Sequence, residues 1–205
     1  MTKAVIFDTD GMVVITDMFS VKYCDEYKVP YENILPFFKN EFQPCLIGKA
    51  DLKEQIKPYL DKWGWEKSIE EFLEYWFQAE HHIDQRVIKT ISQLRKSGIK
   101  CYLATNQEIY RTNYLKNEMG FKTVFDQIFS SAEIGFKKPQ VEFFNVVIKE
   151  IGLDRNEIQF WDDTQKNVLA AKEAGFDAHL YTKFEEFKLE MDTLLKSIVD
   201  NRQQL

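Results

Sequence analysis

The sequence predicts an α/β fold with a doubly wound parallel sheet and an inserted block of helices. From Asp84 onward, short apolar runs typical of buried strands alternate with amphipathic helical patterns. This alternation indicates right-handed βαβ units, and therefore a parallel sheet covered by helices on both faces. Another apolar run, at residues 4–7, is separated from the rest by a long helical region. We therefore expect a core made of residues 1–16 and 84–205, with residues 17–83 forming a small α-helical domain.

Composition and charge narrow the class of protein. The chain has 205 residues, of which 44% are apolar and 29% charged, as in an ordinary globular protein. Its formal net charge of -6 argues against nucleic acid or an anionic membrane surface as a partner. No apolar run is long enough for a signal peptide or a membrane span, so we expect a cytoplasmic protein, with a monomer favoured. The three cysteines show no CxxC spacing and fit reduced thiols.

The helical region divides into segments at proline and glycine residues. Amphipathic patterns predict helices at residues 17–28, 31–41, 51–63 and 68–80, and Pro58 should kink or interrupt the third. Aromatic side chains are concentrated here. Their helical spacing favours packing between helices over a ligand site, although a few remain available to line a cleft.

The elements of the core are expected in a regular order. Strands are predicted at residues 4–7, 99–104, 124–130, 158–161 and 178–181. The intervening helices include one at 108–119 and one that starts with Pro139 in its first turn. A last amphipathic helix begins near Phe184.

Polar side chains follow three of these strands. They are Asp8 and Asp10, Thr105 and Asn106, and Asp162 and Asp163, with Lys138 near the start of a later helix. Parallel sheets place ligands at the carboxyl ends of their strands, so we expect these groups to converge. Four carboxylates in one crevice need a cation to remain ionised, and oxygen ligands suit Mg²⁺. Taken alone, Asp8-Thr9-Asp10-Gly11 fits a strand that simply ends in a turn equally well.

These motifs resemble those of the haloacid dehalogenase superfamily, in its phosphatase branch, over nearly the whole chain. The first motif of that family is similar to DTDG at residues 8–11, and the second to the Thr105 that ends a later strand. The third resembles Lys138 in GFKKP, and the acidic fourth resembles Asp162-Asp163 in FWDDTQ. Each motif is weak alone, but the four in this order are specific. The resemblance implies a Rossmann-like core, and identifies the helical region as the α-helical cap of the family.

The same resemblance implies a role for each acidic residue. Asp8 is then the nucleophile that forms an aspartyl phosphate, and carboxylates do serve as covalent nucleophiles for phosphoryl groups. Asp10 is the general acid for the leaving alcohol and the base that activates water. Mg²⁺ is held by the Asp8 carboxylate, the Asp10 backbone carbonyl and a carboxylate of Asp162 or Asp163, with Asp163 the stronger candidate.

The remaining motif residues are implied to bind the phosphoryl group. Lys138 offsets its charge. Thr105 donates a hydrogen bond to it, aided by Asn106. Two alternatives stay open: Thr105 as the cap of the following helix, and Lys137 in place of Lys138. Asn167 stands where many members of the family carry a carboxylate.

The expected function is Mg²⁺-dependent hydrolysis of a small phosphorylated metabolite, such as a sugar phosphate, with the cap closing over the site. We expect the joints of the cap near Thr16 and Asp84, and a substrate contact from Lys49 in a cap loop. A phosphomutase of the β-phosphoglucomutase type would use the same residues, and a non-catalytic binding module is a third hypothesis. A dehalogenase is a weaker alternative, because it needs neither Asp10 nor a metal.

Overall fold

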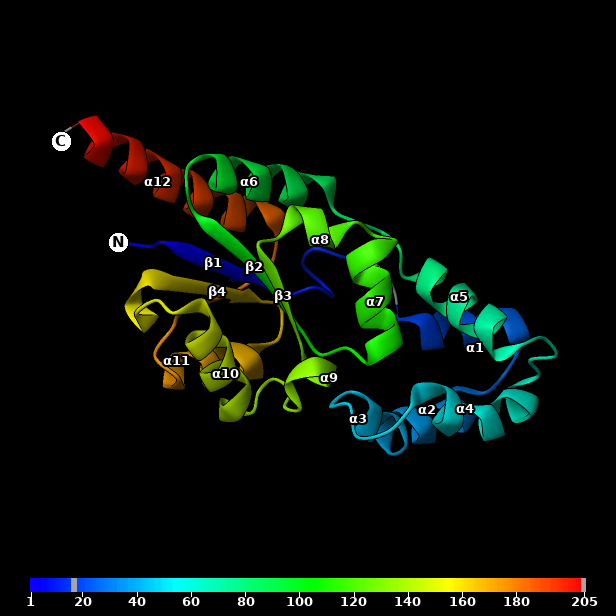
Figure 1. The fold of residues 1–205 in the computed structure, drawn as a ribbon. Coiled ribbons are helices and arrows are strands. Elements are labelled where there is room, and N and C mark those ends of the chain that lie inside the picture. The colour runs from blue at the N-terminus through cyan, green and yellow to red at the C-terminus, as the bar shows by residue number, and fades with distance from the viewer. Residues whose placement is uncertain (16–17, 204–205) are drawn as a thin grey trace.

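Five parallel strands form the centre of the protein, in the order β3-β2-β1-β4-β5 (Figure 1). The computed structural model describes residues 1–15 and 18–203. The strands are β1 (Ala4–Phe7), β2 (Lys100–Thr105), β3 (Gln127–Ser130), β4 (Ile158–Asp162) and β5 (Asp177–Leu180). The predicted doubly wound parallel sheet is confirmed.

Helices cover both faces of this sheet. On one face lie α6 (Gln85–Lys96) and α12 (Phe184–Gln203), and on the other α10 (Val141–Ile151) and α11 (Gln165–Glu173) (Figure 1). The side chains of β1 alternate between two apolar cores: Val5 and Phe7 pack on the α6 side, and Ala4 and Ile6 on the α10 side. Because β1 is buried on both faces, every residue of this strand is apolar.

The remaining core helices are short; three of them lie around β2 and β3, and the last directly precedes β4. They are α7 (Ile109–Asn117), α8 (Phe121–Val124), α9 (Ser131–Ile134) and the 3₁₀ turn η2 (Arg155–Glu157). The third strand is shorter than the predicted 124–130: α8 ends at Val124, and β3 begins only at Gln127. Gly120 permits this helix: it adopts φ +72° at the N-cap, a left-handed conformation that glycine takes without steric cost.

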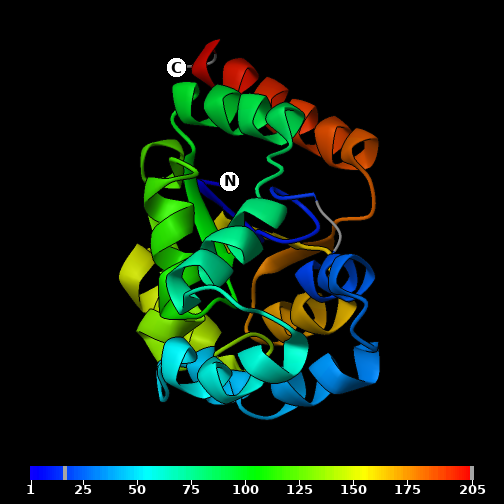
Figure 2. The same ribbon diagram turned by 90° about the vertical axis from the view of Figure 1, so that its right-hand side faces the viewer.

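The inserted helical block lies beyond the carboxyl ends of the strands (Figures 1 and 2). It consists of α1 (Phe19–Tyr27), α2 (Tyr31–Lys39), α3 (Phe42–Cys45), α4 (Leu52–Leu60), the 3₁₀ turn η1 (Asp61–Trp63) and α5 (Ile69–Ala79). The four predicted helices are present, and α3 is an additional one. Aromatic side chains pack between these helices. The Phe72 ring, for example, lies 5.3 Å from that of Trp65 and 5.6 Å from that of Tyr23.

Two prolines behave differently from the prediction. Pro58 does not interrupt α4, which continues through it to Leu60. It lies in the last turn of the helix, where only one backbone hydrogen bond is lost, and the buried side chains of Ile56 and Leu60 hold this part of the helix against its neighbours. Pro139 precedes α10 and is not part of its first turn, because Gln140 is the N-cap.

The chain leaves the core and returns to it side by side. The Ile15 N–H donates to the carbonyl of His82 at 2.9 Å, and the Asp84 N–H donates to the carbonyl of Val13 at 2.9 Å. Asp84 also caps α6, since its carboxylate accepts from the Arg86 N–H at 2.9 Å. The other expected joint, near Thr16, lies outside the described residues. Over the described ranges, no helix combines the length and apolar character needed to cross a membrane.

Candidate active site

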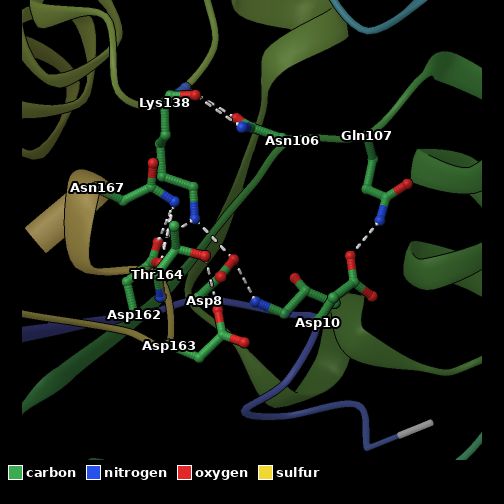
Figure 3. Close-up of polar contacts among 10 residues, drawn as sticks. Asp8, Asp10, Asn106, Gln107, Lys138, Asp162, Asp163, Thr164 and Asn167 are labelled. Carbon is green, nitrogen blue, oxygen red and sulfur yellow. Dashed lines mark hydrogen bonds and ion pairs between the residues drawn. The ribbon is translucent and has the colours of Figure 1, made fainter. Parts of the chain in front are cut away.

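Strand register brings the polar strand ends together. Phe7 at the end of β1 pairs with Leu103 on one side and with Trp161 on the other. The residues that follow, Asp8 and Asp162, therefore emerge at the same edge of the sheet. The Lys138 ammonium lies between them, with Nζ 2.6 Å from Asp8 Oδ1 and 2.6 Å from Asp162 Oδ2 (Figure 3). All three residues are buried.

Burial and ion pairing compete at this trio. Burial raises the pKa of the Asp8 carboxyl, and the charge of Lys138 opposes that rise. For Lys138, burial works against the ammonium, but the two carboxylates outweigh it and raise the pKa. Asp8 Oδ1 also accepts a hydrogen bond from the Thr9 N–H at 2.7 Å. Among the described residues both of these donors reach Oδ1, which leaves Oδ2 for a reacting group or a cation.

Three carboxylates offer oxygen atoms to a metal ion. One oxygen each from Asp8, Asp162 and Asp163 lies within 4.8 Å of the others. A set of carboxylate oxygens beside the Lys138 ammonium fits a hard divalent cation such as Mg²⁺. The three carboxylates differ in the hydrogen bonds that they accept from the protein. Asp162 accepts from Lys138, from the Thr164 N–H at 2.8 Å and from Asn167 at 3.0 Å, whereas the Asp163 carboxylate is exposed.

Gly11 leaves the space in which the Asp163 carboxylate lies. It has φ +79°, and a Cβ atom at this position would lie 1.9 Å from Asp163 Oδ2. A side chain at this position would displace the Asp163 carboxylate from where it lies. The glycine of the DTDG motif therefore has a steric role in the site as well as a role in the turn.

The Asp10 carboxylate lies apart from this cluster (Figure 3). Its Oδ2 accepts a hydrogen bond from Gln107 Nε2 at 2.6 Å. The surrounding protein raises the pKa of Asp10 by desolvation, while the charges of Arg111 and Lys138 oppose the rise. A raised pKa suits a carboxyl group that must donate a proton. The sequence analysis assigned no role to Gln107, and only its place directly after Thr105 and Asn106 pointed to the site.

Arg111 is a buried cation that the sequence analysis missed. Its side chain is 2% exposed, and its guanidinium donates to the carbonyls of Phe77 and Glu80, each at 3.0 Å. These carbonyls belong to the end of α5 and the residue after it, so Arg111 on α7 ties the inserted block to the core. An arginine on a helix usually faces solvent, and no motif marks this one.

The second strand contributes Thr105 and Asn106. The Asn106 amide bonds twice to the backbone of Lys138, donating to its carbonyl and accepting from its N–H, both at 2.8 Å. This side chain therefore positions Lys138. Thr105 is buried, and its hydroxyl has no hydrogen-bond partner among the described residues. The alternative in which Thr105 caps the next helix is wrong, because Glu108 is the N-cap of α7.

The positions of the two lysines decide between Lys138 and the alternative, Lys137. Lys137 turns to the side chain of Gln43 in the inserted block, whereas Lys138 contacts Asp8 and Asp162. Lys49 is not among the residues that line the two cavities beside Asp10, and its contact with a substrate stays a prediction.

A cavity of about 360 Å³ lies at the site where the motif residues converge. Its lining includes Asp8, Asp10, Lys138, Asp163 and Asn167. A larger cavity of about 640 Å³ lies at the opposite end of the sheet, where β2 begins, and contains none of the predicted site residues. The 360 Å³ cavity is therefore the candidate active site, because the carboxylates and the ammonium predicted from the motifs line it.

Comparisons with known proteins agree on one family for this chain. The chain matches the family model of haloacid dehalogenase-like hydrolases over residues 5–180. A sesquiterpene phosphatase from Aspergillus oryzae is 36% identical over 93 residues, which cover 45% of this chain and 47% of that protein. The D-ribitol-5-phosphate phosphatase of Bacteroides thetaiotaomicron is 26% identical over 162 residues, covering 76% of this chain and 78% of that protein. The chain spans about half the length of the first of these relatives.

A solved structure shares the fold. It is a haloacid dehalogenase family enzyme from Bacteroides thetaiotaomicron, in complex with magnesium and inorganic phosphate. The TM-score is 0.76 at 21% identity, and the superposition covers 89% of this chain and 95% of that one.

Proposed function

Because this chain belongs to the family of haloacid dehalogenase-like hydrolases, we propose that it is a Mg²⁺-dependent phosphomonoesterase that works through an aspartyl phosphate on Asp8. One observation carries the proposal: the buried Lys138 ammonium bridges Asp8 and Asp162, beside the exposed Asp163 carboxylate. Such a site combines a carboxylate nucleophile with cationic charge for the phosphoryl oxygens. The phosphatases among its relatives support the reaction type.

In the first step, Asp8 Oδ2 attacks phosphorus and the ester P–O bond breaks. Asp10 gives its proton to the departing alkoxide. In the second step, water attacks the phosphorus of the aspartyl phosphate and gives its proton to Asp10. The bond between Asp8 and phosphorus then breaks, so that inorganic phosphate leaves and the Asp8 carboxylate is regenerated.

The other residues position the phosphoryl group or neutralise its charge. Lys138 neutralises charge on the transferring group. Asn106 holds the backbone of Lys138, and the Thr105 hydroxyl is a candidate donor to the phosphoryl group. When bound, Mg²⁺ neutralises the phosphoryl oxygens, and the candidates to hold it are Asp8, Asp162, Asp163 and the carbonyl of Asp10.

We further propose that residues 17–83 act as a cap over this site. The block lies at the carboxyl ends of the strands, and its entry and exit run side by side at Val13 and Asp84. A cap that closes would exclude water during the first step. A monomeric state and a place in the cytoplasm remain predictions from the sequence.

The test is hydrolysis of p-nitrophenyl phosphate with and without Mg²⁺. We expect turnover that EDTA abolishes, and no turnover above background in Asp8→Asn. Asp177→Asn is the matched control, because Asp177 lies exposed at the start of β5. Full activity in Asp8→Asn would remove Asp8 from its role. Conversion of hexose 1-phosphate to the 6-phosphate, without free phosphate, would instead indicate a phosphomutase.

A further inference from the structure

A second cavity adjoins the one that contains Asp8 and Lys138. Its volume is about 340 Å³, and it lies between the core and helices of the inserted block. The two cavities share Asp10, Met18 and Asn106 in their linings. Asp10 is the proposed proton donor to the leaving alcohol, so the organic part of a bound ester leads from Asp10 into this second cavity.

The lining of this second cavity is mainly aliphatic and aromatic. It includes Tyr31, Leu35, Phe38, Phe42 and Trp76, which come from α2, α3 and α5. Such surfaces stabilise apolar groups by removing them from water. The lining also contains the polar side chains of Ser20, Gln43, Asn106 and Gln107, but the apolar side chains outnumber them. A sugar or polyol carries hydroxyl groups along its whole length, and those that face the apolar part lose hydrogen bonds to water without replacement.

Two faces of α2 explain why these residues are available. Ile34 and Phe37 are fully buried in the packing between helices. Leu35 and Phe38, one position further along, are only half-buried and line the cavity. A helix that packs through one apolar face has no structural need for a second one. The Phe38 ring contacts those of Phe42 and Trp76, and the part of this face that remains accessible suits an apolar occupant.

The charges in the lining disfavour a second anionic group. Asp10 and Glu80 are its two acidic residues, and the described part of the lining contains no lysine or arginine. Lys137, the nearby cation, is engaged by the side chain of Gln43. A nucleotide, a bisphosphate or a pyrophosphate would place negative charge against the carboxylates without a compensating cation.

We propose that this cavity binds the uncharged, apolar organic group of a phosphomonoester, an aliphatic chain or a hydrocarbon ring system. The proposal rests on the phosphatase function above and specifies its substrate class. The phosphoryl group lies between Asp8 and Lys138, and the apolar group extends past Asp10 toward Leu35 and Phe38.

The first test is a pair of primary alkyl phosphates, n-octyl phosphate and glucose 6-phosphate, compared by kcat/KM in Mg²⁺. We expect n-octyl phosphate to be favoured by at least about tenfold, the effect of even small apolar differences in a fitted pocket. Equal values, or a preference for glucose 6-phosphate, would overturn the substrate class while leaving the phosphatase function intact.

The second test separates binding from turnover. Octylphosphonate and methylphosphonate cannot be hydrolysed at the P–C bond, and calorimetry in Mg²⁺ gives their affinities. We expect octylphosphonate to bind at least about tenfold more tightly. If this difference is present but no ester is hydrolysed, the apolar site stands and the proposed phosphatase function fails. If the affinities are equal, the apolar site is wrong.

The matched variants are Leu35→Gln and Leu189→Gln. Leu35 lines the cavity, whereas Leu189 lies 67% exposed on α12. We expect Leu35→Gln to reduce the octyl-to-methyl affinity ratio several-fold, and Leu189→Gln to retain it. Circular dichroism spectra of both variants serve as the control for folding. An unchanged ratio in Leu35→Gln would contradict the placement of the chain beside α2.

Discussion

Gln107 donates a hydrogen bond to Asp10 across 97 positions of sequence, with 2.6 Å between Nε2 and Oδ2. This bond fixes the orientation of the proposed acid and base, and it lowers the pKa of Asp10 against the effect of desolvation.

The first prediction concerns this bond. Gln107→Ala leaves the Asp10 carboxyl free to rotate, so turnover should fall by about tenfold to 10²-fold. The pKa of Asp10 should rise, because the hydrogen bond favours its charged form. The basic limb of the kcat/KM profile, where Asp10 loses its proton, should therefore move to higher pH. Gln78→Ala, at an exposed position of α5, should change neither quantity. A profile that does not move in Gln107→Ala would contradict the assignment of that limb to Asp10.

The second prediction concerns the buried ammonium. Lys138→Met leaves the Asp8 and Asp162 carboxylates buried without their cation, which should lower the free energy of unfolding by about 3 to 5 kcal/mol at pH 7 in the absence of Mg²⁺. Added Mg²⁺ should recover part of this loss. Urea denaturation with and without Mg²⁺ measures both effects.

Lys137→Met is the control, because Lys137 contacts Gln43 and not the carboxylates. It should change the free energy of unfolding little and retain turnover. A larger loss in Lys137→Met than in Lys138→Met would reverse the assignment of the two lysines.

The third prediction uses two glycines. Gly11 and Gly120 both adopt positive φ, at +79° and +72°, so alanine at either should cost about 1 to 2 kcal/mol of stability. Only at Gly11 would the new Cβ meet the Asp163 carboxylate; nothing lies within 4 Å at Gly120. Gly11→Ala should therefore raise the Mg²⁺ concentration needed for half-maximal activity, and Gly120→Ala should not. Equal shifts in both variants would mean that Asp163 does not hold the metal.

The fourth prediction concerns pH and stability. Burial raises the pKa of Glu108 to about 7, although its carboxylate accepts from the N–H groups of Tyr110 and Arg111. The folded state then binds more protons than the unfolded state between about pH 4.5 and 7. The contribution of Glu108 is fully present below this range, and is lost as the pH rises through it, by about 3 kcal/mol in total.

Glu108→Gln does not titrate, so its free energy of unfolding should fall less steeply over this range. Thermal or urea unfolding at fixed Mg²⁺, from pH 4.5 to 8, gives the two slopes. Parallel curves for the wild type and Glu108→Gln would show that Glu108 titrates normally.

The sequence by itself determined the sheet and the ends of its central strands. The apolar run at 4–7 is short and is followed by Asp8 and Gly11. A strand that is buried on both faces consists of apolar residues, as this run does. Since parallel strands end at a common edge, the convergence of Asp8 and Asp162 followed from their places in the chain. Local signals failed where a neighbour decided the outcome, as at Pro58 within α4 and at the helix over 121–124.

Only the tertiary structure decided which side chains act on Asp10 and what lines the space beside it. Gln107 and Arg111 lie far from Asp10 in sequence. Gln107 reaches Asp10 because β1 and β2 are neighbours in the sheet, whereas Arg111 is held by the carbonyls of Phe77 and Glu80 at the end of the inserted block. Likewise, the sequence marks Leu35 and Phe37 equally as apolar, but Phe37 is buried between helices and Leu35 faces the cavity. Periodicity identifies apolar faces; the partner of each face is set by packing between elements distant in the chain.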